Sequence, residues 1–137
     1  AHRGLSQLGP ASRRACMGSL LTAGTAVLEP TLAIEVRVPT DLVGNVATIL
    51  SGKRGKVLDM QQKGASSIVI GEIPASETFT LSEAMRGQTA GRATWNTSFK
   101  EWTEVPKSML TTAVADIRKR KGLAPEPPGI SEFIDKE

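Results

Sequence analysis

Apolar side chains occupy every second position between Thr31 and Pro39, at Leu32, Ile34, Val36 and Val38. Because successive side chains of a strand point to opposite faces, this period of two predicts a half-buried β-strand that ends at Pro39. The residues before it, ending in Glu29-Pro30, are interpreted as a linker, because a proline disfavours helical backbone at the preceding residue.

The next segment changes to a helical period, with Thr40 or Asp41 as its expected cap and Gly52 near its end. Its apolar face is expected to consist of Leu42, Val43, Val46, Ile49 and Leu50. Two further strands are predicted over residues 56–62 and 67–73, with a turn at 63–65 between them. A connection this short favours a β-hairpin.

A second short helix is predicted after Pro74, ending before Gly87 and carrying Phe79, Leu81, Ala84 and Met85. A fourth strand is expected over residues 93–102. Trp95 and Phe99 share one parity in it, so Trp102 lies either across a bulge or past the strand end. The resulting order, βαββαβ, predicts an α+β, ferredoxin-like domain with a four-stranded antiparallel sheet and two helices on one face.

Two helices flank this predicted domain. Residues 10–23 favour an N-terminal helix with Pro10 in its first turn, and its few apolar residues require a packing partner. Residues 107–121 favour a C-terminal helix, followed by an extended tail in which Ile130, Phe133 and Ile134 form an apolar patch able to dock on the body or on a neighbour. The expected segments are 1–29, the end of a preceding domain; 30–106, the ferredoxin-like domain; and 107–137, helix and tail.

Composition narrows the class of protein. A chain of 137 residues with 39% hydrophobic residues supports one core. The single cysteine, Cys16, excludes an internal disulfide and fits a reducing compartment, so a cytoplasmic location is expected. No run of residues approaches the roughly 20 apolar positions of a membrane span. The net charge of +3 and the sequence pI near 9.3 raise the odds of a polyanionic partner.

Catalytic motifs are missing from the sequence. The segment Gly52-Lys53-Arg54-Gly55-Lys56 lacks the spacing and the hydroxyl of a phosphate-binding P-loop. His2 is the only histidine, which argues against a Ser-His or Cys-His pair and against a histidine-based metal site. The chain is therefore expected to be no enzyme, and to hold no cofactor or metal.

Several motifs in order resemble one family. His2, Arg3, Gly4 and Gln7 match an H-R-G-x-x-Q loop that leads into a helix with a paired arginine, here Arg13-Arg14. The runs LEPTLAIEVRVP, VGNVATILSGKRGKVLDM and QTAGRA follow, and then R-K-R-K-G-L at residues 118–123. Together they resemble the end of the fourth domain and the fifth domain of archaeal and eukaryotic translation elongation factor 2, in the elongation factor G family.

This resemblance implies a C-terminal piece of a GTPase that promotes GTP-dependent translocation of tRNA and mRNA on the ribosome. It also implies that GTP and magnesium bind in an N-terminal domain of the full-length parent and that His2 is the position modified to diphthamide. The expected partners are ribosomal RNA, stalk-base proteins and other domains of the same factor, with no membrane. The isolated piece is expected to be a monomer, with a cut end at Ala1.

Candidate RNA contacts come from the cations of turns, because a turn beside a rigid sheet presents its side chains without reorganisation. The first candidates are Lys53, Arg54 and Lys56, followed by Arg86 and Arg92.

Two alternative functions remain open. A free-standing ferredoxin-like RNA-binding module would stack bases on sheet aromatics, and the aromatic residues available here lie on one strand. A small-molecule-sensing domain would dimerise through its sheet and carry a ligand cleft.

Overall fold

The computed structural model describes residues 4–134 and divides the chain into two compact units. The sheet unit runs from Leu28 to Glu104. The helical unit combines residues 1–27 with residues 105–137, as far as these are described. The expected division into a preceding domain at residues 1–29, a ferredoxin-like domain at 30–106 and a helix with tail at 107–137 stays a prediction.

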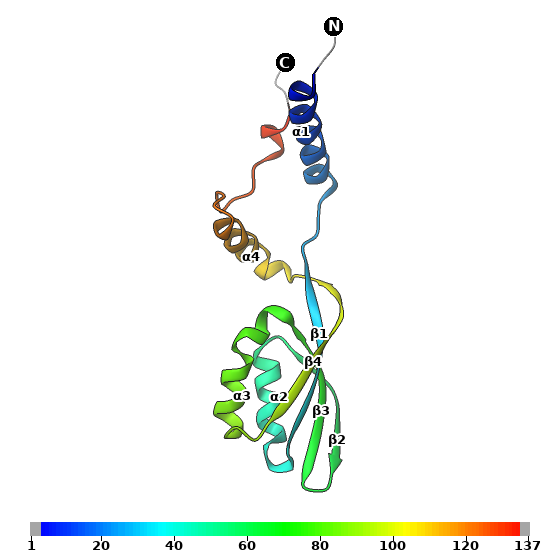
Figure 1. Cartoon of the computed structure of the whole chain (residues 1–137), viewed down its shortest axis with the longest axis vertical. Helices are drawn as coiled ribbons and strands as arrows, with labels where there is room; N and C mark the ends of the chain where they lie inside the picture. Colours follow the sequence, from blue (N-terminus) through cyan, green and yellow to red (C-terminus); the bar gives the residue numbers. More distant parts are fainter. Residues whose placement is uncertain (1–3, 135–137) are drawn as a thin grey trace. The chain divides into compact units, whose positions relative to one another are not determined.

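Four strands and two main helices build the sheet unit. In chain order they are β1 (Leu28–Pro39), η1 (Thr40–Leu42), α2 (Val43–Gly52), β2 (Lys56–Lys63), β3 (Ser66–Pro74), η2 (Ala75–Thr80), α3 (Leu81–Thr89) and β4 (Thr94–Glu104). The strands lie in the order β2-β3-β1-β4, each antiparallel to its neighbours. With α2 and α3 on one face of the sheet (Figure 1), this confirms the predicted ferredoxin-like α+β fold.

The core of the sheet unit lies between the sheet and its two helices. Its buried apolar side chains are Ile34, Val36, Val38, Val46, Ile49, Leu50, Val69, Ile73, Leu81, Met85 and Ala93. Those of β1 are the alternating residues that the sequence pattern placed on the buried face. The helix-facing surface of the sheet is thereby fixed, and the other face mixes polar residues such as Glu35 and Arg37 with the apolar Ile68 and Ile70 that pair with them.

Strand β1 begins earlier than predicted, because the expected linker at Glu29-Pro30 is part of the strand. Pro30 pairs with Trp102 of β4, whereas pairing with β3 starts at Thr31. A proline has no backbone N–H to donate, so a strand tolerates it where one side is unpaired. The prediction missed the first three residues of the strand, Leu28, Glu29 and Pro30, because it treated the proline as a break.

The register of β1 and β4 shifts between Thr31 and Leu32. Thr31 pairs with Glu101 and Leu32 with Phe99, which leaves Lys100 as an extra residue in β4. This is the bulge that the parity of Trp102 suggested. It brings the Phe99 and Trp102 rings to a centroid separation of 5.8 Å.

Two predicted helix ends in the sheet unit are wrong. Among the described residues no side chain caps α2: Leu42 occupies the N-cap position, and the Thr40 hydroxyl lies 3.0 Å from Ser67 Oγ instead. Helix α3 continues through Gly87 to Thr89 and ends at Ala90 and Gly91, where φ is positive. A glycine inside a helix lowers helix stability by about 1 kcal/mol relative to alanine, which is not enough to end α3 at Gly87.

Phe79 also departs from expectation. It belongs to η2 rather than to the second helix, and it is 87% exposed. Leu81 and Met85 are buried in α3, as predicted, and so is Thr89, while Ala84 packs against the core in part.

The helical unit contains α1 (Leu5–Ala23), α4 (Lys107–Arg120) and η3 (Ile130–Glu132). The predicted start of α1 at Pro10 is wrong. The Gly4 carbonyl accepts the N–H groups of Gln7 and Leu8, so the first turn forms upstream of the proline. No residue of Leu5–Ala23 or of Lys107–Arg120 is buried. Within residues 4–134, no helix is both long enough and apolar enough to span a membrane.

The C-terminal segment lies alongside α1 (Figure 1). A side-chain carbon added at Gly18 would meet Phe133 Cβ at 3.4 Å, and Arg14 Nη2 donates to the Glu132 carbonyl at 3.4 Å. The tail therefore docks within this chain, on the N-terminal helix.

The chain enters and leaves the sheet unit at adjacent points. Leu28 at the start of β1 pairs with Glu104 at the end of β4, and the next residue, Val105, donates its N–H to Val27 O at 2.9 Å. Two antiparallel strands therefore form the connection to the helical unit.

Candidate functional site

The turn between α2 and β2 carries three of the five candidate cations. Its backbone is constrained: Gly55 N donates to Leu50 O at 2.8 Å, and a Cβ on Gly55 would lie 2.8 Å from both Leu50 O and Glu72 O. A side chain at position 55 would therefore clash with backbone. Arg54 precedes it with φ of +56°, an uncommon conformation for a residue other than glycine. The turn thus holds Arg54 in one direction.

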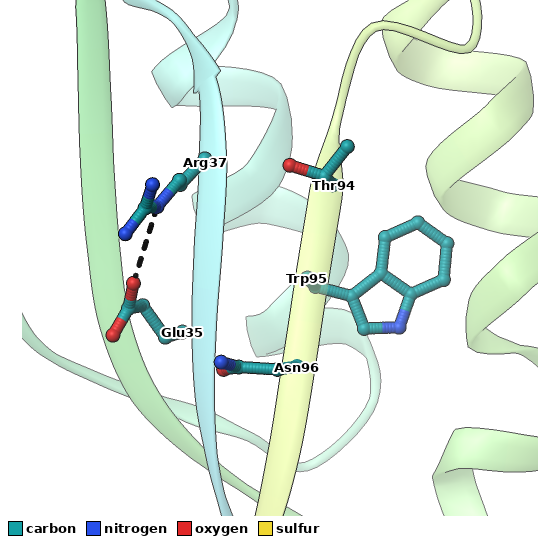
Figure 2. Close-up of a pocket in the computed structure, with 5 residues that line it drawn as sticks. All are labelled: Glu35, Arg37, Thr94, Trp95 and Asn96. Atoms are coloured by element: carbon teal, nitrogen blue, oxygen red, sulfur yellow. Dashed lines mark hydrogen bonds and ion pairs between the residues drawn. The ribbon is translucent and has the colours of Figure 1, made fainter.

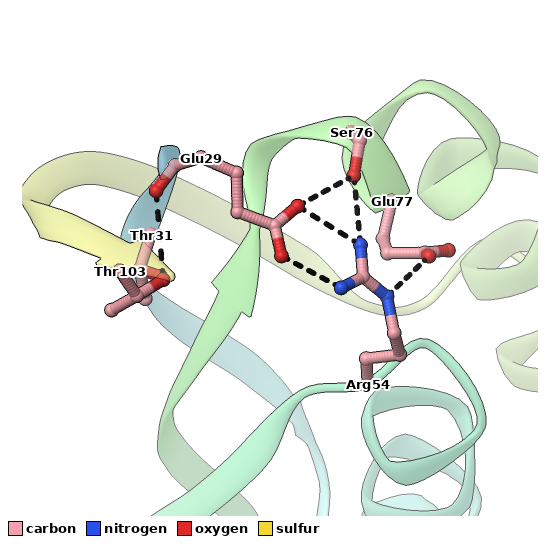
Figure 3. A network of polar contacts seen from close by, with 6 residues as sticks. All are labelled: Glu29, Thr31, Arg54, Ser76, Glu77 and Thr103. Carbon is pink, nitrogen blue, oxygen red and sulfur yellow. Dashed lines mark hydrogen bonds and ion pairs between the residues drawn. The ribbon is translucent and has the colours of Figure 1, made fainter. Parts of the chain in front are cut away.

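The Arg54 guanidinium is held by four hydrogen bonds within the sheet unit (Figure 3). Nη1 and Nη2 donate to the two Glu29 carboxylate oxygens at 2.7 and 3.1 Å, which is a bidentate pair. Nε donates to Glu77 Oε1 at 3.0 Å, and Nη2 also donates to Ser76 Oγ at 3.0 Å. Arg54 therefore ties the outer end of β1, the turn after α2 and η2 to one another.

The network is partly shielded from water, with 25% of the Arg54 side chain, 14% of Glu29 and 27% of Glu77 exposed. The hydrogen bonds that the Arg54 guanidinium donates to Glu29 and, to a lesser extent, to Glu77 raise the pKa of the guanidinium above its ordinary value. One cation faces two carboxylates here, so the cluster has a net negative charge. Its geometry serves to fix the fold of the turn rather than to receive an anion.

The other four candidate cations lie in two places. Lys53 and Lys56 flank Arg54 in the turn, and Arg86 and Arg92 lie on α3 and after it. Lys53 Nζ donates to Thr80 Oγ1 in η2. Arg86 Nη2 lies 3.3 Å from Ser82 Oγ on α3, and Arg92 Nη2 lies 3.6 Å from Asp41 Oδ2. The Lys56 side chain has no hydrogen-bonding or ionic partner among residues 4–134, and it is exposed at the start of β2. The structure brings Lys53 and Arg54 together beside η2; Arg86 and Arg92 lie at the C-terminal half of α3 and just beyond it.

The sheet face opposite the helices carries a shallow depression of about 250 Å³ (Figure 2). Thr94 and Asn96 line it from β4. Glu35 and Arg37 line it from β1, where Arg37 Nε donates to Glu35 Oε1 at 3.4 Å. Ligand pockets usually measure about 300–1,000 Å³ and are mostly apolar. This depression is smaller and polar, whereas a second one of about 320 Å³, lined among others by Ala33, Ile70 and Ser98, falls within that range. The small-molecule-sensing alternative therefore stays a prediction.

The aromatic residues of β4 do not form a base-stacking platform on that face. Trp95 pairs with buried Val36 and packs against the core, and Figure 2 shows its ring on the other side of the strand from Asn96. Phe99 and Trp102 lie near the bulge, 58% and 61% exposed. This arrangement counts against a free-standing module that stacks bases on its open sheet.

The remaining candidate, His2, lies outside the described residues. Within residues 4–134, no three metal-ligating side chains gather into a group that could hold an ion. Sequence reasoning missed the carboxylates of Glu29 and Glu77 as partners of Arg54. Their separation along the chain, 25 and 23 residues from Arg54, leaves no local signal.

Comparison with known proteins gives the class. The family model described as elongation factor G C-terminus matches residues 26–122. A crystal structure of a protein from Thermus thermophilus superposes with a TM-score of 0.62 at 31% identity, covering 71% of this chain and 14% of that one. The chain belongs to the elongation factor G C-terminus family.

Within that family, the chain is similar to elongation factor 2. It is 78% identical over all 137 residues to elongation factor 2 of Cenarchaeum symbiosum, and 46% identical over 134 residues to that of Desulfurococcus mucosus. It covers 19% and 18% of these two proteins. The chain therefore spans about a fifth of the length of the curated relatives it matches.

Proposed function

We propose that this chain is the ribosome-binding C-terminal portion of a translational GTPase that promotes GTP-dependent translocation of tRNA and mRNA during elongation. The observation that carries the proposal is the 78% identity to an elongation factor 2 along the entire chain. The ferredoxin-like sheet unit supports it, because that unit supplies most of the family match.

In this proposal the chain is not an enzyme by itself. GTP and magnesium bind in a part of the parent factor outside these 137 residues, and the parent is the GTPase. The factor works in the cytoplasm, with ribosomal RNA, stalk-base proteins and its own other domains as partners and with no membrane. The isolated chain is a monomer. By its match to the H-R-G-x-x-Q motif, His2 is the diphthamide position.

The sheet unit acts as a rigid adaptor in this proposal. Lys53, Lys56, Arg86 and Arg92 approach ribosomal phosphates, and Arg54 fixes the turn from which the two lysines project. Internal ion pairs support this division of roles, since Arg54 already satisfies two carboxylates.

A chimaera tests the proposal. The matching C-terminal segment of Cenarchaeum symbiosum elongation factor 2 is replaced by this chain, and translocation is followed on ribosomes in the presence of GTP. We expect the rate to stay within about threefold of the parent, since 78% of the exchanged residues are unchanged. A second chimaera carries Leu50→Ala, which removes a buried side chain from the core. It should translocate more slowly if translocation needs a stably folded sheet unit. A folded chimaera that binds GTP but does not translocate would contradict the proposal.

A further inference from the structure

Charge is divided unequally between the two units. The sheet unit has eight basic and nine acidic residues, whereas the segments 1–27 and 105–137 have nine basic and five acidic residues. Their net charges are therefore −1 and +4. The positive charge of the chain comes from the helical unit, and not from the unit that carries the candidate turn.

The cations of the sheet unit are also largely occupied. Ion pairs hold Arg37, Arg54, Arg92 and Lys100, and side-chain hydroxyls accept hydrogen bonds from Lys53 and Arg86. Among them, the hydrogen bond to Glu72 raises the pKa of the Lys100 ammonium. An anion approaching this unit must compete with partners already in place.

The end of α4 presents the opposite arrangement. Residues 118–121 are four consecutive cations, Arg118, Lys119, Arg120 and Lys121. The last three are exposed, and within the described residues none of them has an ionic or hydrogen-bonding side-chain partner. Asp116 is the one acidic residue of α4. These three charges are available without breaking a side-chain contact to any residue of 4–134.

The backbone below this cluster is fixed. Leu123 N donates to Arg118 O at 2.9 Å and Gly122 N to Lys119 O at 3.0 Å, which closes the helix end. The Arg118 side chain completes the closure through its Nε, which donates to Ala124 O at 2.6 Å. A fixed helix end presents its cations with little loss of backbone entropy on binding.

We propose that this helix end, residues 118–121, is a phosphate-binding surface for RNA. Consecutive helical residues point about 100° apart, so the charges spread around the helix end and match phosphates spaced along a backbone better than one small anion. Neutralised phosphates release counterions, which favours such contacts at moderate salt. That the RNA is ribosomal rests on the proposed function. That residues 118–121 bind phosphates rests on the charges and contacts described above.

The experiment measures the affinity of the 137-residue chain for a fluorescein-labelled RNA hairpin of about 20 base pairs, from about 50 to 300 mM KCl. The test variant combines Lys119→Gln, Arg120→Gln and Lys121→Gln. The control variant combines Arg37→Gln, Lys63→Gln and Lys107→Gln, three exposed cations from other parts of the chain with the same total charge change. Circular dichroism and urea unfolding of both variants establish that each is folded.

We expect the test variant to lose about tenfold or more in affinity near 0.15 M salt, and the slope of log affinity against log salt to shrink by about 2–3. The control should change less than about threefold. Equal losses in both variants would show attraction by net charge and overturn the proposal. An unchanged test variant that is only less stable would overturn it too, and would assign the cations to the helix dipole.

Ribosome co-sedimentation separates this surface from the proposed function. Ile117 and Leu123 beside the cluster are 42% and 49% exposed, which makes a protein partner the competing outcome. If the test variant loses ribosomes but keeps its hairpin affinity, the surface binds protein and the RNA proposal is overturned. If the translocating chimaera fails while the hairpin results hold, the surface stands and the proposed function falls.

Discussion

The sheet unit and the helical unit use their residues in opposite ways. In the sheet unit, eleven apolar residues are buried and the cations are mostly tied to neighbouring acids and hydroxyls. In the helical unit, α1 and α4 bury no residue within their bounds, and three adjacent cations at the end of α4 are unoccupied by any partner among residues 4–134.

The comparison shows that a cluster of cations is not by itself free to bind an anion, because its side chains can already be paired within the fold. The turn at residues 53–56 has the density of cations expected of an RNA contact, but its central arginine directs its hydrogen bonds to Glu29, Glu77 and Ser76. Burial explains why: a half-buried carboxylate such as Glu29 needs a partner, and removing that partner would leave a charge poorly solvated.

The largest effect is expected in the core of the sheet unit. Leu50→Ala removes a fully buried side chain and should lower the free energy of unfolding by about 2–5 kcal/mol. Urea unfolding, followed by the fluorescence of the core-packed Trp95, measures it. Leu58→Ala on β2, where the side chain is 56% exposed, is the matched control and should cost well under half as much. Equal losses would mean that the assigned core is wrong.

The Arg54 network should have the next largest effect. Arg54→Ala leaves the carboxylates of Glu29 and Glu77 without their cation, and should lower the free energy of unfolding by about 2–3 kcal/mol. Arg37→Ala, which breaks a pair whose arginine is 68% exposed, should cost at most about 0.5 kcal/mol. Chemical denaturation of the two variants side by side makes the comparison. If they are equally stable, Arg54 is not a structural tie and its guanidinium becomes available for RNA again.

The smallest effect is expected where the tail packs on α1. Gly18→Leu places a large side chain against Phe133 and should raise hydrogen exchange at the Phe133 amide about tenfold, which corresponds to about 1.4 kcal/mol. Gly18→Ala adds one carbon at an ordinary contact distance of 3.4 Å and should instead stabilise the helix by about 0.5–1 kcal/mol. Gly9→Leu, which meets nothing within 4 Å, is the control. Unchanged exchange in Gly18→Leu would show that the tail does not dock there.

Periodicity predicted the sheet unit well because its signals are local. Alternation located β1, the short turn predicted the β2–β3 hairpin, and the parity of Trp102 pointed to the bulge at Lys100. The failures came where two local signals competed. Gly87 resembled a helix stop, but Gly91 with a positive φ follows four residues later and ends the segment.

The candidate site was less predictable because its contacts are long-range. Nothing near Arg54 in the sequence reveals that Glu29 and Glu77 converge on it in the fold. The basic run at residues 118–121 was visible in the sequence as a motif of the family, but it was not among the candidate RNA contacts. Knowing which cations have partners required the side chains of the whole chain.

The paired ends of the sheet unit have a practical consequence for the architecture of the chain. Since Leu28 lies opposite Glu104, the 77 residues between Val27 and Val105 form a cassette whose two ends meet. A short hairpin turn could take the place of the cassette and still join the two segments of the helical unit, and the cassette could be transplanted into another loop whose ends are equally close.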